Sequence, residues 1–337
     1  MPDPPDLAIE RAIEFLRRRQ LPHGEFSVLL GSDGQFSHAV HDPSVFGTAI
    51  VLHALMHLDR ARVADMVDAA VSFLRSEMEF GGVWRYYSKR QHRLARLPPD
   101  VDDTACASDM LRSAGARVPR NTWAFLSSRN ERGLFRTWIP PIRNSRWNPL
   151  VAFARFVGDC QARLRVRGVP VPAVEDPRFH VMHIDLDEID QVVNANVVLY
   201  LGERPETLPA IEMLLRWATD GPPASPHYPD PLVFCYAVAR AARRAAPRLA
   251  AAREPIVAYV TEFARRSDAL TPLQAAWALC ALLTFDAGST VVTGLLRHII
   301  DTQRDDGGWK AYAYYGRVFG SEELTTAACL EALAQSQ

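Results

Sequence analysis

The sequence predicts an all-α protein, an α/α double-ring barrel of the α6/α6 type built from helix pairs. Apolar residues recur with helical spacing along the 337-residue chain, whereas strand-like alternation between turns is scarce. The predicted helices are of two kinds, and a turn motif recurs at the ends of one kind. Because the repeat extends along the chain, we expect a single domain over residues 1–337.

The first kind of helix is amphipathic with one charged face, which is typical of an outer layer. We expect such helices at residues 8–20, 62–77, 119–129, 206–219, 250–266 and 290–303. The second kind is apolar nearly all round and rich in alanine, which places it inside. We expect these helices at residues 46–57, 103–114, 230–240, 272–283 and 324–334, with 149–156 and 192–201 as further candidates.

Several outer helices share an ending, in which an aromatic or aliphatic pair precedes a polar turn, a glycine and an aromatic residue. The glycine and aromatic members are Gly24 and Phe26, Gly82 and Trp84, Gly133 and Phe135, and Gly307 and Trp309. This recurrence predicts helix-pair repeats with unequal loops, arranged as a closed double ring or, alternatively, as an open superhelix. The loops from outer to inner helices should gather at one end and form an aromatic pocket with a basic rim.

Composition restricts the partners and the compartment. The formal net charge of -1 gives no broad attraction to nucleic acid or to an anionic membrane. The cysteines lie far apart without a CxxC pair, so buried thiols in a reducing cytoplasm are expected. Residues 1–6 lack the pattern of a signal peptide, and no stretch reaches the roughly 20 apolar residues of a membrane span. A soluble cytoplasmic protein is therefore expected.

Three carboxylates, Asp100, Asp102 and Asp103, stand where a loop meets a predicted inner helix. Aspartate and threonine are favoured N-caps, and acids near a helix N-terminus are stabilised by the helix dipole. Packed carboxylates facing an apolar barrel cannot all ionise cheaply, so one pKa should rise and supply a general acid. We expect Asp103 to cap the helix and Asp102 to carry the proton.

The run Asp100-Val101-Asp102-Asp103-Thr104-Ala105 resembles the DxDD acid motif of class II terpene cyclases, the squalene–hopene cyclase superfamily. Residues 271–279 (TPLQAAWAL) resemble an inner helix of that family, and residues 302–309 (TQRDDGGW) resemble its QW repeat. Residues 44–49 (SVFGTA) resemble another of its segments. The matches extend from about residue 44 to 334, and they imply the same barrel fold.

The resemblance implies a role for each matching residue. Asp102 would be the Brønsted acid that protonates a terminal alkene or epoxide, with Asp100 and Asp103 tuning it. Asn196 stands where the family often has a histidine that anchors the acid, and a neutral amide can hold a carboxyl group in the same way. The residues placed against the substrate are Phe46, Trp84, Tyr86, Tyr315 and Phe319, whose π faces would stabilise carbocations. Gln303 and Trp309 would brace helices.

The chain is long enough only for the barrel that carries the aspartates. A farnesyl or geranylgeranyl diphosphate is therefore a more suitable isoprenoid substrate than squalene, unless a second copy or a partner protein closes the cavity. Protonation needs no cofactor, but a diphosphate would need cations and could bring Mg²⁺. The cations expected to serve it are Arg90 and Arg93, with Lys89, Arg96, Arg136, Arg143 and Arg146 as further candidates. No metal ligand is assigned, because residues 180–188 match no metal motif and the zinc set of protein prenyltransferases is not recognisable.

Two other functions fit the pattern. A non-catalytic α/α-barrel could bind an isoprenoid or a protein partner, with the aspartates serving only as a helix cap. An α/α-barrel glycoside hydrolase would need a second acid about 5 to 10 Å away in the same cavity. Glu322 and Glu323 are the candidates for that acid, although the apolar inner helices disfavour a sugar site.

Overall fold

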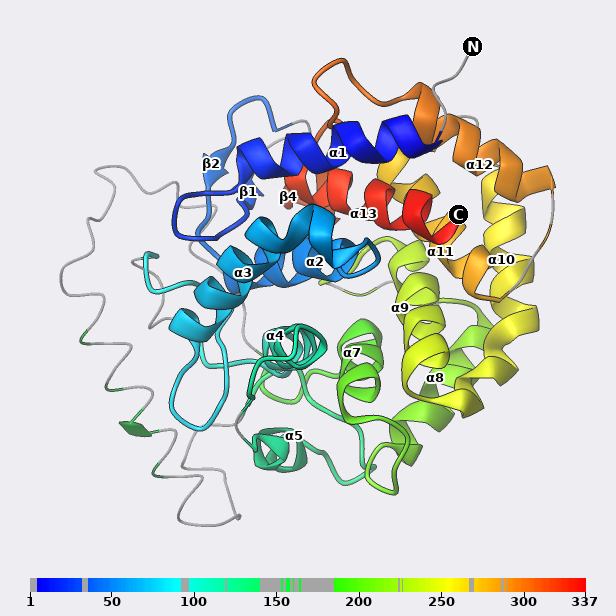
Figure 1. Cartoon of the computed structure of the whole chain (residues 1–337). Helices are drawn as coiled ribbons and strands as arrows, with labels where there is room; N and C mark the ends of the chain where they lie inside the picture. Colours follow the sequence, from blue (N-terminus) through cyan, green and yellow to red (C-terminus); the bar gives the residue numbers. More distant parts are fainter. Residues whose placement is uncertain are drawn as a thin grey trace.

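The computed structural model describes residues 5–31, 36–91, 97–118, 120–139, 185–223, 225, 227–266, 270–285, 288 and 290–337, with isolated positions between 153 and 164. Helices of an outer and an inner layer alternate along the chain (Figure 1). The outer helices are α1 (Pro5–Arg19), α3 (Arg60–Glu77), α5 (Thr122–Ser127), α8 (Leu208–Asp220), α10 (Arg253–Arg266) and α12 (Thr290–Asp301). The inner helices are α2 (Val45–Leu55), α4 (Val101–Ser113), α7 (Gln191–Leu201), α9 (Pro231–Arg244), α11 (Pro272–Thr284) and α13 (Glu322–Gln335).

The inner helices form a closed ring. Each packs against the next in the order α2, α4, α7, α9, α11 and α13, and α13 packs back against α2. Outer helices cover this ring, as where α1 packs on α13, α3 on α2 and α8 on α7 (Figure 1). The prediction of an all-α barrel is confirmed, and the ring closes instead of opening into a superhelix. The 3-10 helix η5 (Pro247–Ala252) connects α9 to α10.

The inner helices are buried nearly all round because few of their positions are polar. All residues from Val45 to Leu55 in α2 are buried, and in α11 the buried run extends from Pro272 to Leu282 with Gln274 as its one half-buried member. The outer helices instead bury one stripe, such as Ala8, Ile9, Ala12 and Leu16 in α1. This division follows from the two hydrophobic patterns in the sequence.

The repeated helix ending forms one repeated contact. Gly24, Gly82, Gly133 and Gly307 all have positive φ. The backbone N–H of the aromatic residue two positions later donates to a side chain of an inner helix: Phe26 to Thr48, Trp84 to Thr104, Phe135 to Asn194 and Trp309 to Thr326, at 3.0 to 3.1 Å. A Cβ at Gly307 would stand 2.3 Å from the carbonyl oxygen of Arg11, so only glycine allows this close approach. Each turn thus ties an outer helix to the inner helix that follows.

A small antiparallel sheet of order β2-β1-β4-β3 adds strands to the predicted helices. β1 (Leu29–Leu30) and β2 (Val40–His41) come from the loop after α1, and β3 (Tyr312–Tyr315) and β4 (Phe319–Ser321) form a hairpin before α13. The strands have two to four residues, too short for alternation to be recognised in the sequence. The sheet joins the first and last loops of the barrel and carries aromatic residues.

Most helix boundaries fall within a few residues of the predicted ones. The predicted outer helix at 119–129 is shorter, Thr122–Ser127, and the candidate inner helix at 149–156 lies almost wholly outside the described residues. Within the described part of the chain, no helix combines the length and apolarity that crossing a membrane requires.

Candidate functional site

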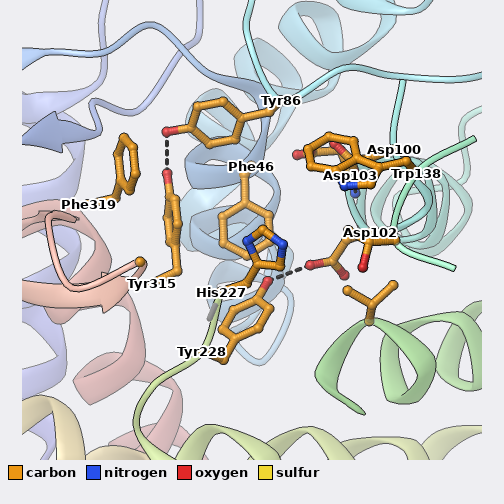
Figure 2. A pocket seen from close by; sticks show the side chains of 13 residues that line it. Phe46, Tyr86, Asp100, Asp102, Asp103, Trp138, His227, Tyr228, Tyr315 and Phe319 are labelled. Carbon is orange, nitrogen blue, oxygen red and sulfur yellow. Dashed lines mark hydrogen bonds between the residues drawn. The ribbon is translucent and has the colours of Figure 1, made fainter. Parts of the chain in front are cut away.

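A cavity opens among the first turns of the inner helices and the β3–β4 hairpin (Figure 2). Its space is about 570 Å³ when the open mouth is included. The walls are formed by Phe46, Tyr86, Asp100, Asp102, Asp103, Thr137, Trp138, Val193, His227, Tyr228, Tyr315, Gly316 and Phe319. Aromatic and apolar surface predominates, and the three aspartates form one side.

The local sequence explains how the carboxylates come together. Asp100 is the N-cap of α4, and its side chain accepts a hydrogen bond of 2.6 Å from the backbone N–H of Asp103. The helix therefore begins at Val101, and Asp102 and Asp103 lie in its first turn. The prediction that Asp103 caps the helix was wrong: in the first turn its backbone N–H receives the cap, and an aspartate one turn earlier supplies the accepting oxygen.

Burial raises the pKa of all three carboxyl groups. Asp103 is shifted furthest, first by burial and then by the neighbouring charge of Asp100. Burial also raises the pKa of Asp100, but its side-chain and backbone hydrogen bonds from Asp103 oppose the rise. The pKa of Asp103 is therefore raised furthest above its ordinary value, and the pKa of Asp102 is raised as well.

Asp102 differs from its neighbours because its oxygens have donors from other helices. The amide of Asn196 in α7 donates to its Oδ1 at 2.7 Å. The hydroxyl of Tyr228 contacts its Oδ2, as Figure 2 shows. Burial raises the pKa of Asp102, while these hydrogen bonds and the charge of Arg240 lower it. The hydrogen bond from Asn196 is the one that the resemblance implies. When Asp102 gives up a proton, the resulting carboxylate therefore already has hydrogen-bond donors in place.

Arg240 of α9 lies behind Asn196. It is 8% exposed, its guanidinium donates to Oδ1 of Asn196, and its charged end lies 5.0 Å over the ring of Tyr236. Arginine stays protonated in proteins, so the amide of Asn196 is polarised by a permanent positive charge. The neutral Asn196 therefore connects Asp102 to a cation one step further away.

Aromatic rings surround the rest of the cavity. Phe46 of α2 contacts Tyr315 edge to face with ring centroids 5.0 Å apart, and Tyr315 stacks on Phe319 at 5.1 Å. The β3–β4 register pairs Tyr315 with Phe319, which aligns the two rings. Tyr86 packs edge to face against both. All four predicted substrate-facing residues named here therefore line the cavity: Phe46, Tyr86, Tyr315 and Phe319.

The prediction that Trp84 faces the substrate was wrong. Trp84 is 0% exposed and does not line the cavity, because its indole N–H donates to the carbonyl of Leu74 at 2.8 Å in the wall between layers. Trp309 makes the equivalent bond to the carbonyl of Ile299 at 2.9 Å. Both tryptophans brace an outer helix, and so does Gln303, whose amide donates to the carbonyl of Ala8 at 2.9 Å.

The predicted cationic rim is not formed by the described arginines. Arg90 pairs with Glu77 at 3.3 Å and Arg136 with Asp187 at 2.8 Å, and neither lines the cavity. Arg93, Arg96, Arg143 and Arg146 lie outside the described residues. No lysine or arginine lines the cavity within the part of the chain that the structure describes.

The second acid of a glycoside hydrolase is not found in its predicted place. Glu323 pairs with Arg19 at 2.9 Å and Glu322 pairs with Arg304, on the side of α13 that faces α1 and the outer turn. Neither residue lines the cavity. The ion pairs with the outer layer explain their position and remove the support for the glycosidase alternative.

Sequence reasoning missed several residues of the cavity. Tyr228 and His227 come from the loop before α9, and Trp138 comes from the loop before the undescribed segment. The backbone of Trp138 pairs with that of Asp100 in an isolated antiparallel β-bridge. The imidazole of His227 pairs with the carboxylate of Glu188 at 2.6 Å. For Tyr228 the available signal was its position just before the inner helix α9. Residues at that position lie at the end of the barrel where the carboxylates lie.

A second polar cluster is buried among α2, α9 and α13. The ligand atoms of His53, His57 and Glu331 lie within 4.8 Å of one another. The other carboxylate oxygen of Glu331 accepts from Tyr236 at 2.6 Å. The charges of Arg240, Arg243 and Arg244 lie nearby and oppose a bound cation. We therefore treat the cluster as part of the core.

This cluster predicts a pH-dependent stability. Burial lowers the pKa of His57 to about 4 from 6.5, so the unfolded chain binds more protons than the folded one between these values. The free energy of unfolding should therefore fall as pH decreases from 7 to 4, by on the order of 3 kcal/mol for this group. In His57→Gln, urea unfolding at pH 7 and pH 4 should show a loss smaller by about that amount. The exposed control His38→Gln should retain the wild-type loss; an equal loss in His57→Gln would contradict the prediction.

Comparison with solved structures identifies the fold. A protein from Actinoplanes matches with a TM-score of 0.67 and 19% identity over 99% of this chain and 100% of that one. The type II terpene cyclase MstE from Scytonema, in a complex with geranylgeranyl dihydroxybenzoate, matches with a TM-score of 0.65 and 15% identity over 98% and 97%. The ent-copalyl diphosphate synthase from Streptomyces platensis matches at 0.53 and 17%, over 86% of this chain and 50% of that one. The chain thus shares its helical barrel fold with type II terpene cyclases.

The sequence itself is divergent. No family model matches it, and no curated protein matches it. At these identities the likeness is one of fold, and the chemistry has to be argued from the cavity.

Proposed function

We propose that this protein is a class II terpene cyclase that cyclises a linear isoprenoid, starting the reaction by protonation from Asp102. One observation carries the proposal: a buried carboxyl group, supplied with donors from α7 and the loop before α9, faces an aromatic cavity. The shared fold with type II terpene cyclases supports it.

In the first step, Asp102 would donate its proton to the terminal double bond or epoxide of the substrate. The O–H bond of Asp102 breaks and Asp102 becomes an anion. The π pair of the alkene forms a new carbon–hydrogen bond, or the epoxide oxygen takes the proton and its carbon–oxygen bond opens, and either event leaves a carbocation. Tyr228 and Asn196 would stabilise that anion through hydrogen bonds, and Arg240 through its charge. Asp103 would tune the acid by keeping nearby negative charge low, because its pKa is raised well above the ordinary value. Asp100 would tune it by capping the first turn of α4, where Asp102 lies.

The cavity aromatics would then carry the cation through ring closure. The π faces of Phe46, Tyr315 and Phe319 stabilise positive charge without trapping it covalently. Burial of the acid keeps bulk water from the cation, which would otherwise add and end the reaction early. Loss of a proton from the cyclised cation completes the cycle.

The proposed substrate class comes from a structural neighbour. The type II terpene cyclase MstE, which shares this fold, was solved with geranylgeranyl dihydroxybenzoate, so a farnesyl or geranylgeranyl chain is proposed in preference to squalene. Should the head group be a diphosphate, Arg93, Arg96, Arg143 and Arg146, which lie outside the described residues, and Mg²⁺ would be expected to bind it.

A substrate panel tests the proposal. Purified protein is incubated with farnesyl diphosphate, geranylgeranyl diphosphate, squalene and geranylgeranyl dihydroxybenzoate, each with and without Mg²⁺. We expect a cyclic product from at least one prenyl chain of 15 or 20 carbons, detected by gas chromatography and mass spectrometry. The absence of any cyclic product under all conditions would argue for the non-catalytic alternative, a barrel that only binds an isoprenoid or a protein partner.

A further inference from the structure

A second chain of polar groups lies at the opposite wall of the cavity from Asp102. The hydroxyl oxygens of Tyr86 and Tyr315 are 2.6 Å apart, and both residues line the cavity. Figure 2 shows Phe46 between this pair and Asp102, in agreement with its ring contacts to Tyr315 at 5.0 Å and to Tyr228 at 6.3 Å. The two polar ends are therefore separated by the aromatic surface over which a substrate would lie.

The chain ends on a buried carboxylate. Tyr86 donates its hydroxyl hydrogen to Oδ2 of Asp42 at 3.0 Å, and the amide of Gln91 donates to Oδ1 of Asp42 at 2.7 Å. Asp42 is 2% exposed and does not itself line the cavity. Both contacts donate to Asp42, so each of its carboxylate oxygens accepts a hydrogen bond.

The hydrogen bonds have one direction. A carboxylate has no hydrogen to give, so the single hydroxyl hydrogen of Tyr86 points at Asp42. Tyr315 must then be the donor in the bond between the two tyrosines, and its hydrogen points at Tyr86. Tyr315 lines the cavity, and its oxygen also interacts with the side chain of Ser44. The remaining lone pair of this oxygen is the accepting end of the chain.

We propose that Tyr315, Tyr86 and Asp42 take up the proton that ends the cyclisation. This inference rests on the proposed cyclase function and assigns the base of that reaction. Tyr315 is the catalytic residue, because its oxygen would meet the departing hydrogen; Tyr86 and Asp42 act through it.

The transfer balances along the chain. A carbon–hydrogen bond next to the cationic carbon breaks, its electron pair forms the new double bond, and the proton goes to the Tyr315 oxygen. Tyr315 passes its own hydroxyl proton to Tyr86, and Tyr86 passes its own to Asp42. The carboxylate becomes a carboxylic acid, and both tyrosines end as neutral phenols. After product release, exchange with solvent returns a proton to Asp102 and removes one from Asp42.

A relay through two phenols fits a carbocation reaction. A carboxylate in the cavity itself could add to the cation and trap it as an ester, whereas a phenol backed by a carboxylate accepts a proton and is a weaker nucleophile. Burial raises the pKa of both tyrosines well above its usual value, so both stay neutral. The base is thus strong only in combination with Asp42, which the substrate does not touch.

The test measures product composition. Tyr315→Phe, Tyr86→Phe and Asp42→Asn are compared with wild type on the substrate that the panel identifies. All three variants keep Asp102, and the two Phe variants keep their aromatic rings, so the readout is the ratio of products, normalised to the total substrate consumed. The wild-type alkene should fall about tenfold relative to other double-bond isomers and water-trapped alcohols, which corresponds to about 1.4 kcal/mol. Asp42→Glu should restore part of the wild-type ratio.

Tyr314→Phe is the matched control. Tyr314 is the buried neighbour of Tyr315 and touches Phe46, but it does not line the cavity, so its product ratio should be that of wild type. Circular dichroism checks that each variant folds. If Asp42→Asn does not fold, Tyr86→Phe still interrupts the chain between Tyr315 and Asp42 and so tests the same proposal. An unchanged isomer ratio in folded Tyr86→Phe and Tyr315→Phe would overturn the relay alone. A wild type without cyclic product would overturn the proposed function and the relay with it.

Discussion

Asp102→Asn is expected to lower kcat/KM by about 10³- to 10⁴-fold while the protein stays folded. Asparagine has nearly the shape of the carboxyl group and can keep the contacts to Asn196 and Tyr228, but it has no acidic proton to give. Without that proton the carbocation does not form. Steady-state kinetics on the substrate identified by the panel, with product detection by mass spectrometry, measures the loss.

Two further measurements separate a catalytic role from a structural one. Thermal unfolding of Asp102→Asn should stay within a few degrees of wild type, since a buried carboxyl with a raised pKa is replaced by a neutral group. The Kd for the substrate should change less than about threefold, because the aromatic walls are intact. Turnover within tenfold of wild type would exclude Asp102 as the initiating acid.

Arg240→Gln is expected to reduce kcat by about 10- to 100-fold with little change in KM. Hydrogen bonds to charged groups contribute about 1.5–3 kcal/mol, and each 1.4 kcal/mol is tenfold in rate. Arg240 supplies that charge through Asn196, so its removal leaves the Asp102 anion less stable. The substrate does not touch Arg240, so binding should be nearly unaffected.

The pH profile of Arg240→Gln should shift in a direction that a loss of packing alone would not produce. Activity needs protonated Asp102, so the rate falls as pH rises through the pKa of that group. The charge of Arg240 lowers the pKa of Asp102, and removing it should move the falling limb to higher pH while the plateau rate drops. Arg244→Gln, one turn along α9 and paired with Asp109, is the control and should leave the limb in place. A limb that does not move in Arg240→Gln would contradict the role of this charge.

Local pattern carried much of the prediction. The positions of the inner helices and the glycine turns follow from residues that are neighbours in the chain, because helical periodicity and positive φ are local properties. The same holds for Asp100 to Asp103, which had to lie at the start of an inner helix. Even here a shift of one turn in the cap could not be resolved, since Asp100 and Asp103 are both good N-caps.

Side-chain direction was less predictable. Trp84 and Tyr86 are two residues apart, and both follow the glycine turn. Trp84 points between the layers to the carbonyl of Leu74, whereas Tyr86 points into the cavity toward Tyr315. An aromatic residue near a predicted pocket has two apolar environments to choose from, and the sequence does not distinguish them.

The sequence by itself determined that this chain forms a helical barrel and that a carboxylate cluster begins one of its inner helices. Only the tertiary structure decided what surrounds that cluster. Tyr228 and Asn196 reach Asp102 from 126 and 94 residues away, and Tyr315 reaches Tyr86 from 229 residues away. These distances are bridged only when the ring closes and its loops meet at one end. The pKa of each carboxyl depends on burial and on partners that closure creates, which no local pattern specifies.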